Sequence, residues 1–329
     1  MNTLTADWQR ELAEAFSSID ALCHHLQIDA SSLPLLRDYK SFPLRVPKGF
    51  VDCMQKGNPH DPLLRQVLPL KDELIEVPGY SLDPVGDLAA TTQAGVIHKY
   101  HGRVLLIVTG GCAVHCRYCF RRNFPYADQQ LSTQKMEQAL AYIEQHNEIS
   151  EVILSGGDPL LLSDSKLKTM VQRIAAIPSI ERIRIHSRIP IVLPSRITPE
   201  LLDTFASLGP AIILVLHANH AHELSDHVAK ACQALKQRGV TLLNQSVLLK
   251  QVNNDAESLI KLSVKLFAAG VLPYYLHQLD RAAGVGHFEV DKSEALSLLA
   301  ILQQRLPGYL VPKLVQEQAG AAHKIVLTN

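Results

Sequence analysis

The sequence between residues 104 and 119 reads Val104-Leu105-Leu106-Ile107-Val108-Thr109-Gly110-Gly111-Cys112-Ala113-Val114-His115-Cys116-Arg117-Tyr118-Cys119. It opens with an apolar run typical of a buried strand and continues into a loop that carries three cysteines with C-x3-C-x2-C spacing. Three thiolates in one short loop suit a metal centre better than a disulfide framework. They can hold three irons of a cubane iron–sulfur cluster and leave the fourth iron open. A structural zinc of the Cys3His type, with His115 as the fourth ligand, is the alternative.

Short apolar runs alternate with stretches of helical period from residue 103 onward. The runs cover residues 104–108, 152–154, 183–185, 212–216, 241–247 and 274–276. The helical stretches cover residues 133–144, 166–176, 199–208, 226–238, 256–269 and 293–306. Strand–helix units in succession predict a parallel sheet with right-handed crossovers. The expected fold class is therefore α/β, with a partial (β/α)6 barrel of the TIM-like type, and an open doubly wound sheet is the alternative.

Polar residues stand in the last part of every predicted strand or directly after it. The segments are Thr109-Gly110-Gly111-Cys112, Ser155-Gly156-Gly157-Asp158, His186-Ser187-Arg188, His217-Ala218-Asn219-His220, Asn244-Gln245 and His277-Gln278-Leu279-Asp280. A β/α barrel builds its active site from the carboxyl ends of its strands. We therefore expect these side chains to meet at one site.

The first 98 residues lack the regular alternation of apolar runs and helical stretches that the rest of the chain shows. Residues 7–26 have helical spacing, and a proline-punctuated stretch follows over residues 34–84. We predict a mainly helical N-terminal extension over residues 1–98 and the barrel over residues 99–306. A short C-terminal segment would cover residues 307–329.

Composition narrows the class of protein. The chain has 329 residues, 47% of them hydrophobic, and its 32 basic and 32 acidic residues give no net charge. This balance argues against binding to a nucleic-acid backbone. The longest apolar run is far shorter than the roughly 20 residues of a membrane helix, and no secretory signal is visible. Clustered cysteines indicate a reducing compartment, so we expect a cytoplasmic enzyme without nucleic-acid or membrane partners.

The cysteine loop resembles that of radical S-adenosylmethionine enzymes. The resemblance implies that Cys112, Cys116 and Cys119 hold a [4Fe–4S] cluster whose open iron binds S-adenosylmethionine. The turn after the second predicted strand supports this interpretation, because glycines let backbone groups approach a ligand closely and Asp158 could meet a cationic amino group. We assign Ser155, Gly156, Gly157 and Asp158 to the methionine end of that cofactor.

A second cofactor is suggested near the C-terminus by Gly320-Ala321-Ala322-His323-Lys324, where a lysine follows a loop of small residues. Such a lysine could form a Schiff base with pyridoxal phosphate, although the residues alone do not decide this. From Phe50 to its end the chain resembles the lysine 2,3-aminomutases, especially the short members that serve elongation factor P. The resemblance rests on Gly57-Asn58-Pro59, His98-Lys99-Tyr100-His101, the cysteine loop with Phe120-Arg121-Arg122, Ser155-Gly156-Gly157-Asp158-Pro159-Leu160, Asn244-Gln245-Ser246-Val247, Pro273-Tyr274-Tyr275-Leu276-His277 and Gly308-Tyr309-Leu310-Val311-Pro312-Lys313.

The resemblance implies roles for further residues. Lys324 matches the pyridoxal-phosphate lysine, and the loop before it is poorer in glycine than is usual in the family. The residues matching those that hold the cofactor are Lys99, Tyr100 and Arg103 at its phosphate, with His217 and Gln245 lining its pocket. Arg121 would grip the substrate carboxylate, while Asp280 and Glu317 would bind the side-chain ammonium.

The implied reaction converts L-lysine to (R)-β-lysine by 1,2-amino migration. A reductant such as flavodoxin or ferredoxin would supply the electron. The sequence ends at Asn329, shortly after Lys324, and in this it is similar to the short members of the family. The resemblance to these short members implies a pathway link to elongation factor P and its lysyl ligase. Two alternatives stay open: a catabolic aminomutase for lysine or another amino acid, and an iron–sulfur or zinc protein that binds or modifies RNA.

Overall fold

The computed structural model describes residues 7–37, 40–93, 95–129 and 131–328 and contains one mixed β-sheet. Its strands are β1 (Thr91–Gln93), β2 (Val96–Tyr100), β3 (Arg103–Thr109), β4 (Glu151–Gly156), β5 (Arg182–Ser187), β6 (Ala211–Leu216), β7 (Thr241–Val247), β8 (Leu272–His277), β9 (Lys313–Gln316) and β10 (Ile325–Val326). All six predicted strands are present as β3 to β8.

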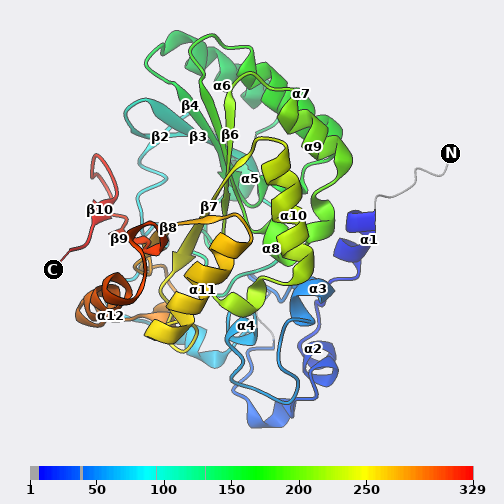
Figure 1. Ribbon diagram of the computed structural model, residues 1–329, viewed down its shortest axis with the longest axis vertical. Coiled ribbons are helices and arrows are strands. Elements are labelled where there is room, and N and C mark those ends of the chain that lie inside the picture. Colours follow the sequence, from blue (N-terminus) through cyan, green and yellow to red (C-terminus); the bar gives the residue numbers. More distant parts are fainter. Residues whose placement is uncertain (1–6, 38–39, 94, 130, 329) are drawn as a thin grey trace.

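The strands lie in the sheet in the same order as in the sequence. Each pair from β3 to β9 is parallel, whereas β1, β2 and β10 join the edges through antiparallel pairs. A doubly wound sheet reverses its strand order at a switch point, and this sheet does not. The structure therefore confirms the partial, open barrel and excludes the doubly wound alternative (Figure 1).

Helices follow the parallel strands and cover the outer face of the sheet (Figure 1). The α-helices are α1 (Asp7–Ala13), α2 (Ile19–His25), α3 (Lys48–Val51), α4 (Pro62–Arg65), α5 (Tyr126–Gln129), α6 (Thr133–Gln145), α7 (Asp164–Ala175), α8 (Ile189–Val192), α9 (Pro199–Ala206), α10 (Asp226–Gln237), α11 (Ala256–Ala268) and α12 (Lys292–Arg305). Short 3-10 turns are η1 (Ala30–Ser32), η2 (Lys71–Leu74), η3 (Pro159–Leu161), η4 (Pro194–Arg196), η5 (Ala221–Glu223), η6 (Gly286–Phe288) and η7 (Gly308–Leu310).

Side-chain caps fix where the long helices begin. The N-cap side chain accepts a hydrogen bond from the first turn at Ser132, Ser163, Thr198, Ser225 and Asp255, before α6, α7, α9, α10 and α11. These caps explain why helical periodicity placed the helices to within about two residues. Within the described residues, none of the helices combines the length and apolarity that crossing a membrane requires.

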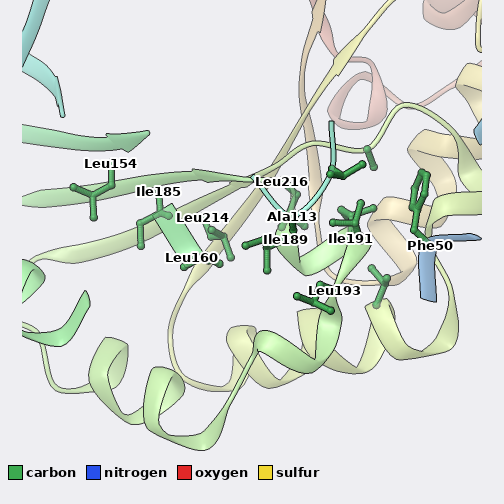
Figure 2. Packing of buried hydrophobic residues seen from close by; sticks show 14 of the residues in the cluster. Phe50, Ala113, Leu154, Leu160, Ile185, Ile189, Ile191, Leu193, Leu214 and Leu216 are labelled. Carbon is green, nitrogen blue, oxygen red and sulfur yellow. The ribbon is translucent and has the colours of Figure 1, made fainter. Parts of the chain in front are cut away.

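The two faces of the strands carry different residue types. Leu154, Ile185 and Leu214, on three neighbouring strands, belong to the buried cluster beneath the helices (Figure 2). The alternate residues Arg184 and His186 of β5 line an internal cavity instead. Side chains on a strand alternate between its faces, so one strand supplies both the core and the site.

The N-terminal region is helical only in part. Instead of one helix over residues 7–26, α1 ends at Ala13 and Phe16 pairs with Val46 in an isolated bridge. Ser18 then caps α2, accepting a hydrogen bond from Ala21 N at 3.3 Å. Irregular segments separate the short helices, and β2 crosses the domain boundary predicted at residue 98. The β2 strand joins this region to the barrel sheet.

Candidate active site

A cavity of about 550 Å³ lies on the inner side of the sheet. Every site residue predicted from the sequence lines it: Cys112, Cys116, Cys119, Ser155, Gly156, Gly157, Asp158, Lys99, Tyr100, Arg103, Arg121, His217, Gln245, Asp280, Glu317 and Lys324. They come from segments up to 225 positions apart in the sequence, since the first is Lys99 and the last is Lys324. The cysteines mark one region of the cavity and Lys324 with Glu317 another, and we call these the cysteine end and the lysine end.

The glycine turn after β4 supports the cysteine loop directly. Gly157 N donates to Thr109 O and Asp158 N donates to Gly111 O, both at 2.7 Å. A Cβ atom on Gly157 would lie 2.1 Å from the carbonyl oxygen of Gly111. The glycine at this position is therefore required by the close crossing of two protein backbones, whereas the sequence suggested close approach of a ligand.

The Asp158 side chain also has protein partners. Its carboxylate accepts hydrogen bonds from Ser187 Oγ at 2.7 Å and from the backbone of Arg188 at 2.8 Å. It also accepts from the backbone of Ile189 and Leu160, both at 3.1 Å. Burial raises the pKa of Asp158 to about 6, against the lowering effect of these donors. In this structure the carboxylate joins the loops after β4 and β5, and its predicted contact with a cofactor amino group stays a prediction.

Arg188 lies beside the central cysteine. Its Nη1 is 2.7 Å from Cys116 Sγ and 2.5 Å from Tyr118 Oη. Its Nη2 donates to Gln66 Oε1 at 2.8 Å and to Glu223 Oε2 at 3.2 Å. Both charged side chains are almost wholly buried. A buried cation thus faces the sulfur, and its own counter-ion lies outside the cavity.

The N-terminal region clamps the same loop through Glu73 of η2. The Glu73 carboxylate accepts from Arg117 Nε at 2.8 Å and Nη2 at 2.5 Å, and from Arg122 Nη2 at 2.6 Å. The His115 ring faces this region too, bonded to Pro43 O at 2.8 Å and stacked on Phe42. The cysteine loop is therefore held from two sides, by the glycine turn and by the N-terminal region.

The thiols fit an iron–sulfur cluster chemically. Burial raises the pKa of Cys119 to about 11 and that of Cys112 above its ordinary value, so metal binding would have to displace their protons. Across the part of the chain that the structure describes, no three His, Cys, Asp or Glu side chains converge on a position for one metal ion. Cysteines that each bind a different iron of a cubane need not share one such position.

Glu317 organises the lysine end. It directly follows β9, and Lys324 directly precedes β10, so the β9–β10 hairpin brings the two side chains together. Glu317 forms an ion pair with Lys324 and accepts a hydrogen bond from Tyr100 Oη at 2.5 Å. Burial raises the pKa of Glu317. The positive charge of Lys324 and the hydrogen bonds lower this pKa by more, so the net shift is downward. Glu317 is therefore ionised and holds the predicted Schiff-base lysine in the cavity.

Arg121 is paired with a carboxylate that the sequence did not single out. Its Nε donates to Asp87 Oδ2 at 2.7 Å and its Nη1 donates to Ser155 Oγ at 3.1 Å. The other Asp87 oxygen lies 2.6 Å from Lys99 Nζ. Arg121 is nearly fully buried, so the predicted carboxylate-binding residue is already oriented within the cavity.

Asp280 faces the charges of the lysine end. Burial raises its pKa to about 7, and Glu317 and Asp87 add to this effect while Lys324 opposes it. A carboxylate that is costly to ionise becomes easier to ionise when a cation binds beside it. This property suits the predicted role of Asp280 in binding an ammonium group.

The inner wall of the cavity also carries histidines to which the sequence gave no individual role. Two predicted pocket residues contact each other, with Gln245 Nε2 3.0 Å from His217 Nε2. Burial lowers the pKa of His217 to about 3. His186 and His277, which the sequence placed at strand ends without giving them a role, carry buried Nε2 atoms without a hydrogen-bond partner in the described residues. A ligand in the cavity would satisfy such atoms. The positions of both histidines at the carboxyl ends of β5 and β8 are the signal by which the sequence placed them at the site.

Comparison with known proteins bears on what the cavity does. Residues 106–262 match the family model described as the Radical SAM superfamily. The chain is 49% identical to the L-lysine 2,3-aminomutase of Escherichia coli over 98% of this chain and 94% of that one. It is 47% identical to the Haemophilus influenzae protein of the same name, over 87% of this chain and 84% of that one. The Clostridium subterminale protein of that name is 32% identical over 97% of this chain and 77% of its own.

Proposed function

Since the chain belongs to the lysine 2,3-aminomutases of the radical SAM superfamily, which are isomerases, we propose that it converts L-lysine to (R)-β-lysine with pyridoxal phosphate, for the modification of elongation factor P. The observation that carries this proposal is the single cavity that joins the cysteine end to the lysine end. An iron–sulfur protein that binds RNA has no use for the second end.

The cysteine end fits a [4Fe–4S] cluster with S-adenosylmethionine. Cys112, Cys116 and Cys119 would hold the cluster, and the backbone of the glycine turn keeps their loop in place. The buried Arg188 guanidinium next to Cys116 would offset the negative charge of the thiolates.

The lysine end fits pyridoxal phosphate together with the substrate. Lys324 would bind the cofactor, with Lys99, Tyr100 and Arg103 at its phosphate and His217 and Gln245 at its sides. When bound, the iron–sulfur cluster with S-adenosylmethionine supplies a carbon radical, and pyridoxal phosphate carries the migrating amino group.

The chain's own residues orient the substrate at both ends. Arg121 would bind the α-carboxylate, while Asp280 and Glu317 would bind the ε-ammonium. Recognising both ends of the molecule fixes the carbon between them relative to the cysteine end, which is the contribution of positioning to catalysis. It also favours the free amino acid as substrate.

The proposed pathway link rests on resemblance to the short lysine aminomutases. The product (R)-β-lysine would pass to the lysyl ligase that modifies elongation factor P, and flavodoxin or ferredoxin would supply the electron. Kinetics against several free amino acids separate this role from a catabolic one. Mass spectrometry of elongation factor P incubated with ligase, ATP and the enzyme's product would show the added residue.

The decisive experiment is anaerobic. Reconstituted protein is incubated with isotope-labelled L-lysine, S-adenosylmethionine, pyridoxal phosphate and a reductant, and β-lysine is sought by mass spectrometry after chiral derivatisation. We expect (R)-β-lysine from the wild type and none from Lys324→Ala or Cys116→Ala. Protein with intact cluster and bound pyridoxal phosphate that yields no product would overturn the proposal for free lysine.

A further inference from the structure

Asp87 is a buried carboxylate of the cavity that no sequence motif identified. It lies in the turn between η2 and β1, and the residue is 3% exposed. Its Oδ1 lies 2.6 Å from Lys99 Nζ and its Oδ2 accepts from Arg121 Nε at 2.7 Å. One carboxylate therefore joins the lysine proposed for the cofactor phosphate to the arginine proposed for the substrate carboxylate.

The Asp87 contact leaves Arg121 able to bind a second carboxylate. Asp87 uses the Nε side of the guanidinium, and Ser155 Oγ accepts from Nη1 at 3.1 Å. A guanidinium carries more N–H donors than these two contacts use. The ring of Phe120 lies against it, with the Arg121 Cζ 4.9 Å from the ring centroid. Arg121 is thus held in orientation at the wall of the cavity, with donors left for a second carboxylate.

The backbone around Asp87 is itself fixed. The Asp83 carboxylate accepts from Asp87 N at 2.9 Å and from Leu88 N at 3.1 Å. Thr91 Oγ1 donates to Asp87 O at 2.9 Å. Lys99 Nζ donates to Val85 O at 2.7 Å in the same turn. The position of the carboxylate is therefore set by a hydrogen-bonded turn before ligands arrive.

The charges at Asp87 favour one protonation state. Burial raises the pKa of Asp87, but the adjacent Arg121 and Lys99 lower this pKa by more, so the net shift is downward. Glu317 lies on the other side of Lys99, at 3.6 Å from its Nζ. An ionised Asp87 therefore shares its charge between two cations and cancels only part of their positive charge.

We infer that Asp87 is a positioning residue that sets the distance between Arg121 and Lys99, and so the distance between the substrate carboxylate and the cofactor phosphate. The inference rests on the proposed function and adds a residue to the same site. A positioning role for Asp87 and a role in charge neutralisation alone predict opposite effects of removing its charge. If Asp87 only weakened anion binding, its removal would tighten the binding of pyridoxal phosphate and of lysine. If it positions the two cations, its removal weakens both.

The test compares Asp87→Asn with the wild type in two measurements. Pyridoxal phosphate affinity is titrated by absorbance without substrate, S-adenosylmethionine or reductant, so it does not depend on turnover. The KM and kcat for L-lysine are then measured with the loaded enzyme. We expect the cofactor Kd and the lysine KM each to rise about tenfold, with a smaller change in kcat. Equal or tighter binding of either ligand by Asp87→Asn would overturn the inference.

Two further variants keep the test sharp. Asp203→Asn makes the same chemical change at an exposed aspartate that pairs with Arg238, and we expect wild-type values. If Asp87→Asn does not fold, Lys99→Ala at saturating cofactor replaces it. Losing one anchor of Asp87 should raise the lysine KM, and an unchanged KM would contradict the inference. A wild type that binds no pyridoxal phosphate would instead refute the proposed function, and the inference with it.

Discussion

The two ends of the cavity differ in where the carboxylates that pair with their cations lie. At the cysteine end, Arg117 and Arg188 are paired with Glu73 and Glu223, two carboxylates that do not line the cavity. At the lysine end, Lys324 is paired with Glu317, a carboxylate that faces the cavity and has a proposed ligand of its own.

This difference separates a scaffold from a set of exchangeable contacts. Ligands at the cysteine end would add to pairs that stay intact, because those pairs stand behind the loop. Ligands at the lysine end would replace or share existing pairs. We therefore expect changes at the cysteine end to affect stability and iron content, and changes at the lysine end to affect affinity and pH dependence.

The largest effect is expected from Gly157→Ala. The new methyl group would lie 2.1 Å from Gly111 O, and neither backbone can move without displacing the cysteine loop. We expect iron content to fall severely and activity to drop by at least about a hundredfold, since small displacements of reacting groups are costly. Iron and sulfide analysis of reconstituted protein, with product assays, measures both.

Gly209→Ala is the matched control for that change. A Cβ atom at Gly209 meets no heavy atom within 4 Å, so we expect normal iron content and activity. If Gly157→Ala also retained its cluster, the close crossing of the two loops would not be what holds the cysteines in place.

The next effect is on stability. Glu73→Gln leaves Arg117 and Arg122 buried without their common anionic partner, which we expect to cost about 3–5 kcal/mol of the free energy of unfolding. Denaturant unfolding measures this. Glu181→Gln breaks only an exposed pair with Arg182 and is expected to cost about 0–1 kcal/mol. Equal losses in the two variants would mean that Glu73 does not anchor the scaffold.

A smaller effect, on pH dependence, is expected at the lysine end. The pKa of Asp280 is raised to about 7, so the carboxylate gains a proton as the pH falls through that value and loses attraction for an ammonium group. We predict that kcat/KM for lysine falls between pH 8 and pH 6, a range that brackets this pKa, because kcat/KM reports ionisations of the free enzyme. In Asp280→Asn this pH step should disappear at a lower overall kcat/KM. A step that persists there belongs to another group.

Much of the fold was predictable because it depends on local patterns. Apolar runs located β3 to β8, and the N-cap residues explain the agreement of helix starts. The N-terminal region was harder. Helical spacing continues through residues 14–18, but the long-range pairing of Phe16 with Val46 breaks the helix there. Periodicity does not contain information about such tertiary contacts.

The site was predictable where it rests on motifs and not where it rests on three-dimensional pairing. The cysteine loop has a recognisable local sequence, whereas Lys324 was singled out by the resemblance to the family, and both line one cavity. Asp87 has no such signature, because its contacts with Lys99 and Arg121 form only in the folded chain. The role of Gly157 was similarly hidden, since it depends on the approach of Gly111 from the loop after β3.

The most direct test of the account is to locate pyridoxal phosphate on the chain. The protein is incubated with the cofactor, reduced with borohydride, digested and mapped by mass spectrometry, in the wild type and in Cys116→Ala. Because the two ends are held by separate contacts, we predict one modified residue, Lys324, in both proteins. A label on Lys99 or another lysine, or no label on Lys324 in the wild type, would contradict the assignment of the lysine end.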